Sequence, residues 1–179
     1  FVGRLVEKKG VAYLLDAMPE VLARLPDVRL TIVGYGPEFE PLQQRVKHLG
    51  ISDAVIFTGA LPQLELPARY QTAALFVAPF VEAANGDLEG FPVALMEAVA
   101  CGCPLLAGNI EVLRGAFGDL ADSLLVDPRE TKLLADRIVL ALSDPESASR
   151  HLAQLRETMA SYLDWEVVAE KYAGLLAEL

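Results

Sequence analysis

Several residue types are scarce in this sequence, and their scarcity excludes some classes of protein. Among 179 residues there are only two cysteines, Cys101 and Cys103, and two histidines, His48 and His151. Two cysteines cannot form the disulfide framework of a small secreted protein, and the histidines do not have metal-ligand spacing to them. We therefore expect reduced thiols in a cytosolic protein and no metal site.

Long apolar runs and an excess of basic residues are also missing. No uninterrupted apolar run reaches membrane-spanning length, and no signal peptide is recognisable. Asp and Glu outnumber Lys and Arg by 25 to 15, which gives a net charge of −10 and argues against a nucleic-acid partner. A hydrophobic content of 53% is too high for a disordered chain. The length suits one domain, residues 1–179, with a sizeable core.

Short apolar segments alternate with amphipathic segments along the chain. Strands are predicted at 28–33, 55–58, 75–78, 105–107 and 124–126, and the first residues, 1–5, resemble a strand already under way. Helices are predicted at 11–24, 38–49, 63–72, 131–143, 147–162 and 165–179. This alternation predicts an α/β fold with a doubly wound, Rossmann-like parallel sheet covered by helices on both faces.

The most informative stretch runs from Glu89 to Pro104 and reads Glu-Gly-Phe-Pro-Val-Ala-Leu-Met-Glu-Ala-Val-Ala-Cys-Gly-Cys-Pro. Pro92 suits the first turn of a helix, where its missing N–H costs nothing. The free amides around Gly90 and Phe91, together with the positive end of the helix dipole, predict an anion site.

Two acids, Glu89 and Glu97, lie eight positions apart in this stretch, about two helical turns. Both can contact one elongated ligand whose anionic part rests on the helix N-terminus, which describes a nucleotide-sugar. Alternatively, Glu89 is a helix-start acid and Glu97 a solvated helix residue. Glu97 lies within an apolar run, however, and an acid in such a place needs a partner.

Basic residues follow the first segment, in a loop that contains Arg4, Lys8 and Lys9. Cations just past the carboxyl end of a strand are well placed to neutralise a diphosphate. Ordinary surface basicity is the alternative, and we prefer it for Lys8.

A second loop, Gly34-Tyr-Gly36-Pro, follows the strand at 28–33 and suggests a dinucleotide-binding turn. That fingerprint fails because Phe39 stands where a third glycine belongs, and no acid ends the following strand. A tight turn with close backbone approach explains the two glycines better. This loop, Arg4, Lys9, Gly59 and Glu89 all follow predicted strands, so one edge of the sheet should gather them.

The same residues carry a family resemblance over nearly the whole chain. An acid, seven residues, a second acid and Ala-x-Ala-x-Gly-x-Pro resemble the signature of GT-B-fold retaining glycosyltransferases of the family 4 type, in their C-terminal, donor-binding half. The patterns Gly-Arg-Leu-x-x-x-Lys-Gly, matched by Arg4 and Lys9, and Val-Gly-x-Gly-Pro, matched by Gly34 and Gly36, agree with that family.

The resemblance assigns roles to particular residues. It implies that Arg4 and Lys9 bind the diphosphate and stabilise its departure, that Glu89 faces the donor sugar, and that Glu97 holds the ribose. These three residues, Arg4, Lys9 and Glu89, form the implied catalytic set. The other implied donor-binding residues are Gly34, Gly36, Thr58, Gly59, Leu61, Gly90, Phe91, Pro92 and Val93. For Thr58, Gly59 and Leu61, a plain strand-to-helix connection is an equally good interpretation.

The resemblance also implies an activity and partners. It implies transfer of a sugar from a UDP- or GDP-sugar to a sugar or lipid-linked acceptor, with retained configuration and no essential metal or other cofactor, in polysaccharide or glycoconjugate biosynthesis. The N-terminal GT-B domain is missing from this chain, so we expect it to bind the donor without catalysing transfer. A cytoplasmic location is expected, and peripheral membrane association is compatible with it.

Two alternatives and one loop stay open at this stage. The chain is alternatively another GT-B enzyme, such as a nucleotide-sugar epimerase or a phosphorylase, or a non-catalytic nucleotide-binding domain. The loop from Phe80 to Leu88 is longer than in the plainest family members and is a lid, a selector of the donor sugar or a passive surface loop. It contains two rival acids, Glu82 and Asp87, but only Glu89 fits the spacing to Glu97.

Overall fold

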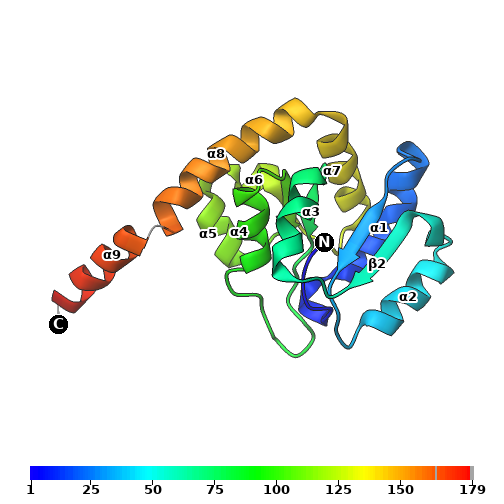
Figure 1. Ribbon diagram of the computed structural model, residues 1–179, viewed down its shortest axis with the longest axis horizontal. Coiled ribbons are helices and arrows are strands. Elements are labelled where there is room, and N and C mark those ends of the chain that lie inside the picture. The colour runs from blue at the N-terminus through cyan, green and yellow to red at the C-terminus, as the bar shows by residue number, and fades with distance from the viewer. Residues whose placement is uncertain (164, 178–179) are drawn as a thin grey trace.

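Parallel strands with helices on both sides make up the computed structural model, which describes residues 1–163 and 165–177 (Figure 1). The strands are β1 (Leu30–Val33), β2 (Val55–Gly59), β3 (Phe76–Ala78), β4 (Leu105–Gly108) and β5 (Leu125–Val126). The α-helices are α1 (Val11–Arg24), α2 (Phe39–His48), α3 (Leu66–Thr72), α4 (Val93–Ala100), α5 (Glu111–Phe117), α6 (Ala121–Leu124), α7 (Thr131–Ser143), α8 (Pro145–Leu163) and α9 (Trp165–Ala177). Short 3₁₀ helices are η1 (Glu7–Lys9), η2 (Ser52–Ala54), η3 (Gln63–Glu65) and η4 (Gly118–Leu120).

Side chains alternate between two cores along the central strands. In β3, Val77 packs with α1 and α7 on one face, whereas Phe76 and Ala78 pack with α4 and α5 on the other. The strands β4 and β5 repeat this alternation. Strands buried on both faces are expected to be apolar at every position, as these are. The predicted α/β class with helices on both faces is therefore confirmed.

The strands are all parallel but form two sheets, β1–β2 and β3–β4–β5, where a single sheet was predicted. The predicted strand at residues 1–5 is reduced to a bridge between Val2 and Val33, so β1 and β3 are not joined. A cavity of about 360 Å³ separates them and is lined by residues that include Phe1, Leu75 and Val77. The sheet is divided because the first residues pair with β1 at one position only.

Helices α1 and α7 pack side by side over one core, although they are more than one hundred positions apart in sequence. An ion pair between Arg24 and Asp136 joins them at the surface. Helix α8 starts beside α7 and runs past α5 and α4, and α9 extends away from the body (Figure 1). Tyr172, Leu175 and Leu176 on α9 are more than 60% exposed. No helix in the described part of the chain combines the length and apolar character that crossing a bilayer requires.

Most predicted elements are present, with differences at their ends. The bounds predicted for α1 and α7 agree with the structure, whereas α8 begins at Pro145, two residues before its predicted start. Pro92 was predicted in the first turn of α4, but it lies just before the helix with extended backbone angles. The helix therefore starts at Val93. The predicted end of the last helix at Leu179 lies outside the described residues.

Candidate functional site

Backbone segments meet at the carboxyl edge of the strands with almost no space between them. The amide of Gly34 donates to the carbonyl of Gly59 at 2.8 Å. A Cβ atom on Gly34 would lie 1.9 Å from the carbonyl oxygen of Gly3, and one on Gly36 would lie 2.3 Å from that of Leu5. Only glycine permits such approaches, as the tight-turn interpretation requires. The edge is thus built backbone against backbone.

The loop from β2 to η3 carries the other residues predicted at this edge. The hydroxyl of Thr58 donates to the carbonyl oxygen of Gly59 at 2.9 Å, so it serves the turn. Leu61 is partly buried against the core that contains α4. These contacts agree with the plain-connection interpretation and leave a role near a ligand untested.

Lys9 and Glu89 form an ion pair beside this edge, with Nζ and Oε2 2.8 Å apart. Their side chains are only 14% and 13% exposed. The ion pair does not have the geometry of a hydrogen bond. Glu89 Oε2 is therefore buried without a hydrogen-bond partner among the described residues. Lys9 also lies 4.8 Å from the centre of the Phe80 ring, a cation–π distance. The structure therefore brings together two predicted site residues, one from η1 and one from the loop before α4.

Arg4 stands apart from this pair. Its side chain is exposed, and no ion pair joins it to a carboxylate in the part of the chain that the structure describes. An unpaired guanidinium at this edge keeps all its donors for a ligand. Arg4 and Lys9 thus differ in state, since only Lys9 is neutralised by the protein.

The loop from Phe80 to Leu88 is fastened to η1. Lys8 Nζ lies 3.0 Å from an Asp87 carboxylate oxygen and donates to the Leu88 carbonyl at 3.1 Å. The amide of Ala84 donates to the Glu7 carboxylate at 2.9 Å. These contacts assign Lys8 and Asp87 to the loop's own structure. Of the three acids considered from sequence, Glu89 is the one paired with Lys9.

Free amides precede α4. The N–H groups of Gly90, Phe91 and Val93 make no hydrogen bond to another backbone group among the described residues. Pro92, which has no N–H, lies between them and is the N-cap of the helix. Val93, the first residue of the helix, is 61% exposed. These amides and the helix dipole suit an anion, and the anion site expected from the sequence stays a prediction.

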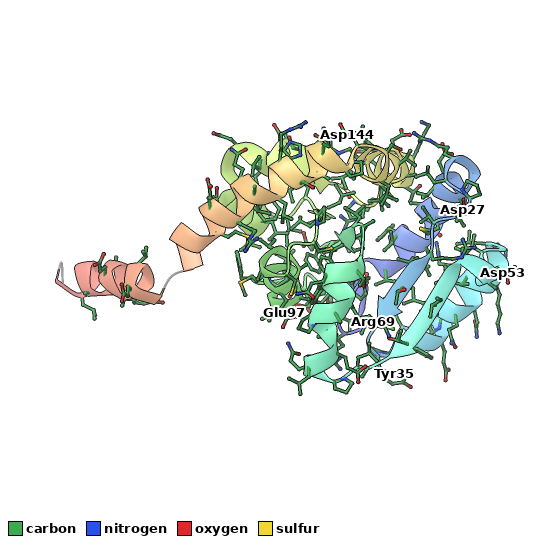
Figure 2. All side chains as sticks on the ribbon, turned by 45° about the horizontal axis from the view of Figure 1, so that its top comes forward. Asp27, Tyr35, Asp53, Arg69, Glu97 and Asp144 are labelled. Atoms are coloured by element: carbon green, nitrogen blue, oxygen red, sulfur yellow. The ribbon has the colours of Figure 1, made fainter. Side chains whose placement is uncertain are left out.

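Glu97, on α4, lies beside α3 (Figure 2). Two side chains hold its carboxylate. Gln63 Nε2 donates to Oε1, and the Tyr70 hydroxyl donates to Oε2 at 3.0 Å. Burial, and then the hydrogen bond to Glu97, raise the pKa of Tyr70 above its usual range. The sequence predicted that Glu97 needs a partner but did not identify these two. The available signal was Tyr70 itself, a tyrosine on a short helix before a buried strand, whose hydroxyl needs a partner when buried.

The carboxyl edge thus offers cations, free amides and carboxylate acceptors. Cations and amides suit phosphate groups, and carboxylates suit sugar hydroxyls. In α/β folds, ligands bind at this edge of the strands. Fold and site together define a Rossmann-like α/β domain whose carboxyl edge carries groups suited to a ligand with both phosphate and hydroxyl groups.

Comparison with known proteins identifies the family. The sequence profile described as "Glycosyl transferases group 1" matches residues 1–158. A GDP-mannose-dependent alpha-(1-6)-phosphatidylinositol monomannoside mannosyltransferase from Mycolicibacterium smegmatis is 35% identical over 182 residues, covering 98% of this chain and 46% of that protein. A putative colanic acid biosynthesis glycosyltransferase, WcaL, from Escherichia coli is 30% identical, covering 99% of this chain and 44% of that protein. The chain therefore belongs to the glycosyltransferase group 1 family, and it spans about half the length of these curated relatives.

Solved structures agree with this fold. The Anabaena protein HepE in complex with UDP has a TM-score of 0.82 at 22% identity, covering 99% of this chain and 48% of that protein. Sucrose-phosphate synthase from Thermosynechococcus elongatus has a TM-score of 0.79 at 28% identity, covering 99% and 44%. The predicted Rossmann-like fold of a GT-B domain is confirmed, and an epimerase or phosphorylase is not favoured.

Proposed function

We propose that this chain is the donor-binding domain of a retaining glycosyltransferase, which transfers a sugar from a nucleotide-sugar to a sugar or lipid-linked acceptor in polysaccharide or glycoconjugate biosynthesis. One observation carries the proposal: Glu89 and Glu97 lie at the two ends of one segment, with free amides between them and Lys9 beside the first. Relatives support it, since one is named GDP-mannose-dependent and a structural neighbour binds UDP.

The donor would lie along this segment. Glu97 would accept hydrogen bonds from the ribose hydroxyls, and the amides before α4 would receive the diphosphate. Glu89 would face the sugar. Residues near Gly34, Gly36 and Gly59 would form the wall on the other side, where backbone approaches closely.

Charge at the diphosphate would be handled by protein cations. When the bond between the anomeric carbon and the diphosphate oxygen breaks, the electron pair leaves with the diphosphate. The acceptor hydroxyl oxygen forms the new bond to that carbon, and its proton passes to the departing diphosphate oxygen. Arg4 and Lys9 stabilise the negative charge that develops on the leaving group, so no essential metal is needed. To contact the phosphate, Lys9 must weaken its ion pair with Glu89, whereas Arg4 has no ion pair among the described residues to give up. The acceptor site would lie in an N-terminal domain, as expected for the half that this chain does not span.

Isothermal titration of the protein with UDP, GDP and ADP in the presence of EDTA tests the proposal. We expect one nucleotide to bind without metal, and Arg4→Ala and Glu97→Ala each to weaken binding by at least about tenfold, the loss expected from one charge-assisted contact. Arg24→Ala and Glu20→Ala are matched controls, because both residues lie on α1 away from the carboxyl edge. Equal losses in the controls, or an absolute requirement for metal, would contradict the proposal.

A further inference from the structure

Both carboxylate oxygens of Glu97 are already held by side chains of the neighbouring helical segment. Gln63, in η3, donates to Oε1, and Tyr70, in α3, donates to Oε2. The two donors are seven positions apart along this segment, about two helical turns, which places them on the same side of it. The carboxylate is thus oriented from outside its own helix.

The two donors differ sharply in mobility. Tyr70 is 2% exposed, and its ring packs edge-on against Phe76 with the ring centres 5.5 Å apart. Gln63 is exposed and free to exchange its contact for water. Because burial and the bond to Glu97 raise the pKa of Tyr70, the hydroxyl keeps its proton and remains a donor at physiological pH. Tyr70 is therefore the fixed partner.

Acceptor sites remain on both oxygens. A carboxylate oxygen accepts about two hydrogen bonds, and one is used on each oxygen of Glu97. One site on each oxygen is left for a ligand. Two neighbouring hydroxyl groups, such as those of a ribose, match a pair of acceptors in this arrangement.

We propose that Tyr70 is a positioning residue whose hydroxyl fixes the Glu97 carboxylate in the orientation that receives the two ribose hydroxyls of a nucleoside diphosphate. This inference rests on the proposed function and adds the group that sets selectivity for ribose over deoxyribose. Tyr70 acts through Glu97 and has no contact with the ligand.

The test compares ribonucleotides with deoxyribonucleotides. GDP, UDP and their 2′-deoxy forms are titrated into the wild-type protein and into Tyr70→Phe, which keeps the ring and removes the hydroxyl. We expect the affinity for the ribonucleotide to fall by about tenfold, because a Glu97 carboxylate that is no longer held in place loses one charge-assisted hydrogen bond from the ribose. We expect the affinity for the deoxy form to change by less than about twofold, since it lacks one of the hydroxyls that Glu97 receives. The preference for ribose then largely disappears.

Phe76→Leu is the matched control for packing. It loosens the surroundings of the Tyr70 ring while leaving the hydroxyl in place, so it should lower the melting temperature and leave the preference for ribose intact. Gln63→Ala should cost less affinity than Tyr70→Phe, because the exposed amide is replaced by water.

Two results overturn the inference in different ways. If Tyr70→Phe weakens ribonucleotide and deoxyribonucleotide equally, or leaves the preference unchanged, the hydroxyl has only a structural role. If the wild-type protein binds neither GDP nor UDP, the proposed function fails for this chain, and this inference fails with it.

Discussion

Lys9 and Glu89 determine the charge beside the carboxyl edge before a ligand arrives. Their side chains are mostly buried, and Glu89 Oε2 has no hydrogen-bond partner in the described part of the chain. A buried carboxylate that loses its counter-ion retains the full cost of leaving water. Removing one member of the pair should therefore destabilise the fold, because the other member stays buried without its counter-ion.

We predict that Lys9→Met lowers the free energy of unfolding by about 3 kcal/mol, because it leaves the Glu89 carboxylate buried and unpaired. The double variant Lys9→Met/Glu89→Leu should recover most of this loss. Urea unfolding at neutral pH measures both. The exposed pair Lys132–Asp136 is the control, since Lys132→Met should cost no more than about 0.5 kcal/mol. A double variant as unstable as the single one would contradict the prediction.

Cys101 and Cys103 should differ in reactivity. Burial raises the pKa of the Cys103 thiol to about 11, and its residue is fully buried, whereas Cys101 is partly exposed. Because the thiolate is the reactive form, iodoacetamide at pH 8 should label Cys101 in the folded protein and leave Cys103 unlabelled until denaturant is added. Fragment-ion mass spectrometry assigns the label. Comparable labelling rates in the folded state would show that Cys103 is accessible.

Some of the candidate site was predictable from sequence because its residues lie in one short segment. Glu89, Glu97 and the amides around Gly90 are fixed relative to one another by the geometry of one loop and helix. The pairing of Lys9 with Glu89 joins residues eighty positions apart, and the contact of Tyr70 with Glu97 joins different helices. Such contacts depend on how elements pack, which spacing in the sequence does not determine.

Among the secondary-structure elements, β4 ends at a glycine that the neighbouring loop makes indispensable. A Cβ atom on Gly108 would lie 1.9 Å from the carbonyl oxygen of Phe80. In α5, by contrast, Gly115 has open space around it. The two glycines are seven positions apart in the sequence, yet substitution should change the free energy of unfolding in opposite directions.

We predict that Gly108→Ala lowers the free energy of unfolding by about 3 kcal/mol or more, because β4 and the loop at Phe80 must move apart to admit the methyl group. Gly115→Ala should raise it by about 0.5–1 kcal/mol, since alanine is favoured over glycine inside a helix. Thermal and urea unfolding of both variants test this. A stable Gly108→Ala protein would show that the loop after β3 can move aside at little cost.

Helices were easier to predict than strands for a physical reason. Helices α1 and α7 carry long amphipathic patterns, so their bounds were predicted correctly. Helix α6 has only one turn and was not predicted. The strands are short apolar runs whose pairing depends on partners distant in sequence, and this is why the division into two sheets was not foreseen.

For the molecule as a whole, Phe1 is part of the interior. The amino group of Phe1 donates to the carbonyl of Thr31 at 3.0 Å beside the cavity between the sheets. In a chain whose first residue is Phe1, burial lowers the pKa of this amino group from 8.0 to about 6. A positive charge at this position therefore opposes folding.

We predict that a chain beginning at Phe1 becomes more stable between pH 6 and pH 8. The unfolded chain binds more protons than the folded one in this window, because its amino group has the higher pKa. The free energy of unfolding should rise by about 2–3 kcal/mol across the window, and the cost is fully present below pH 6. Acetylation of the amino group should remove this part of the pH dependence. An unchanged slope after acetylation would assign it to other groups.

The packing of α1 against α7 has a consequence for synthesis of the protein on the ribosome. The apolar face of α1, with Leu14 and Met18, leaves the exit tunnel well before α7, the helix that covers it, which ends at Ser143. Until α7 has emerged, the core between α1 and α7 is open, and its side chains are available to other nascent chains or to chaperones. Stalling translation before α7 emerges should leave residues 1–60 sensitive to protease, and release of α7 should protect them together.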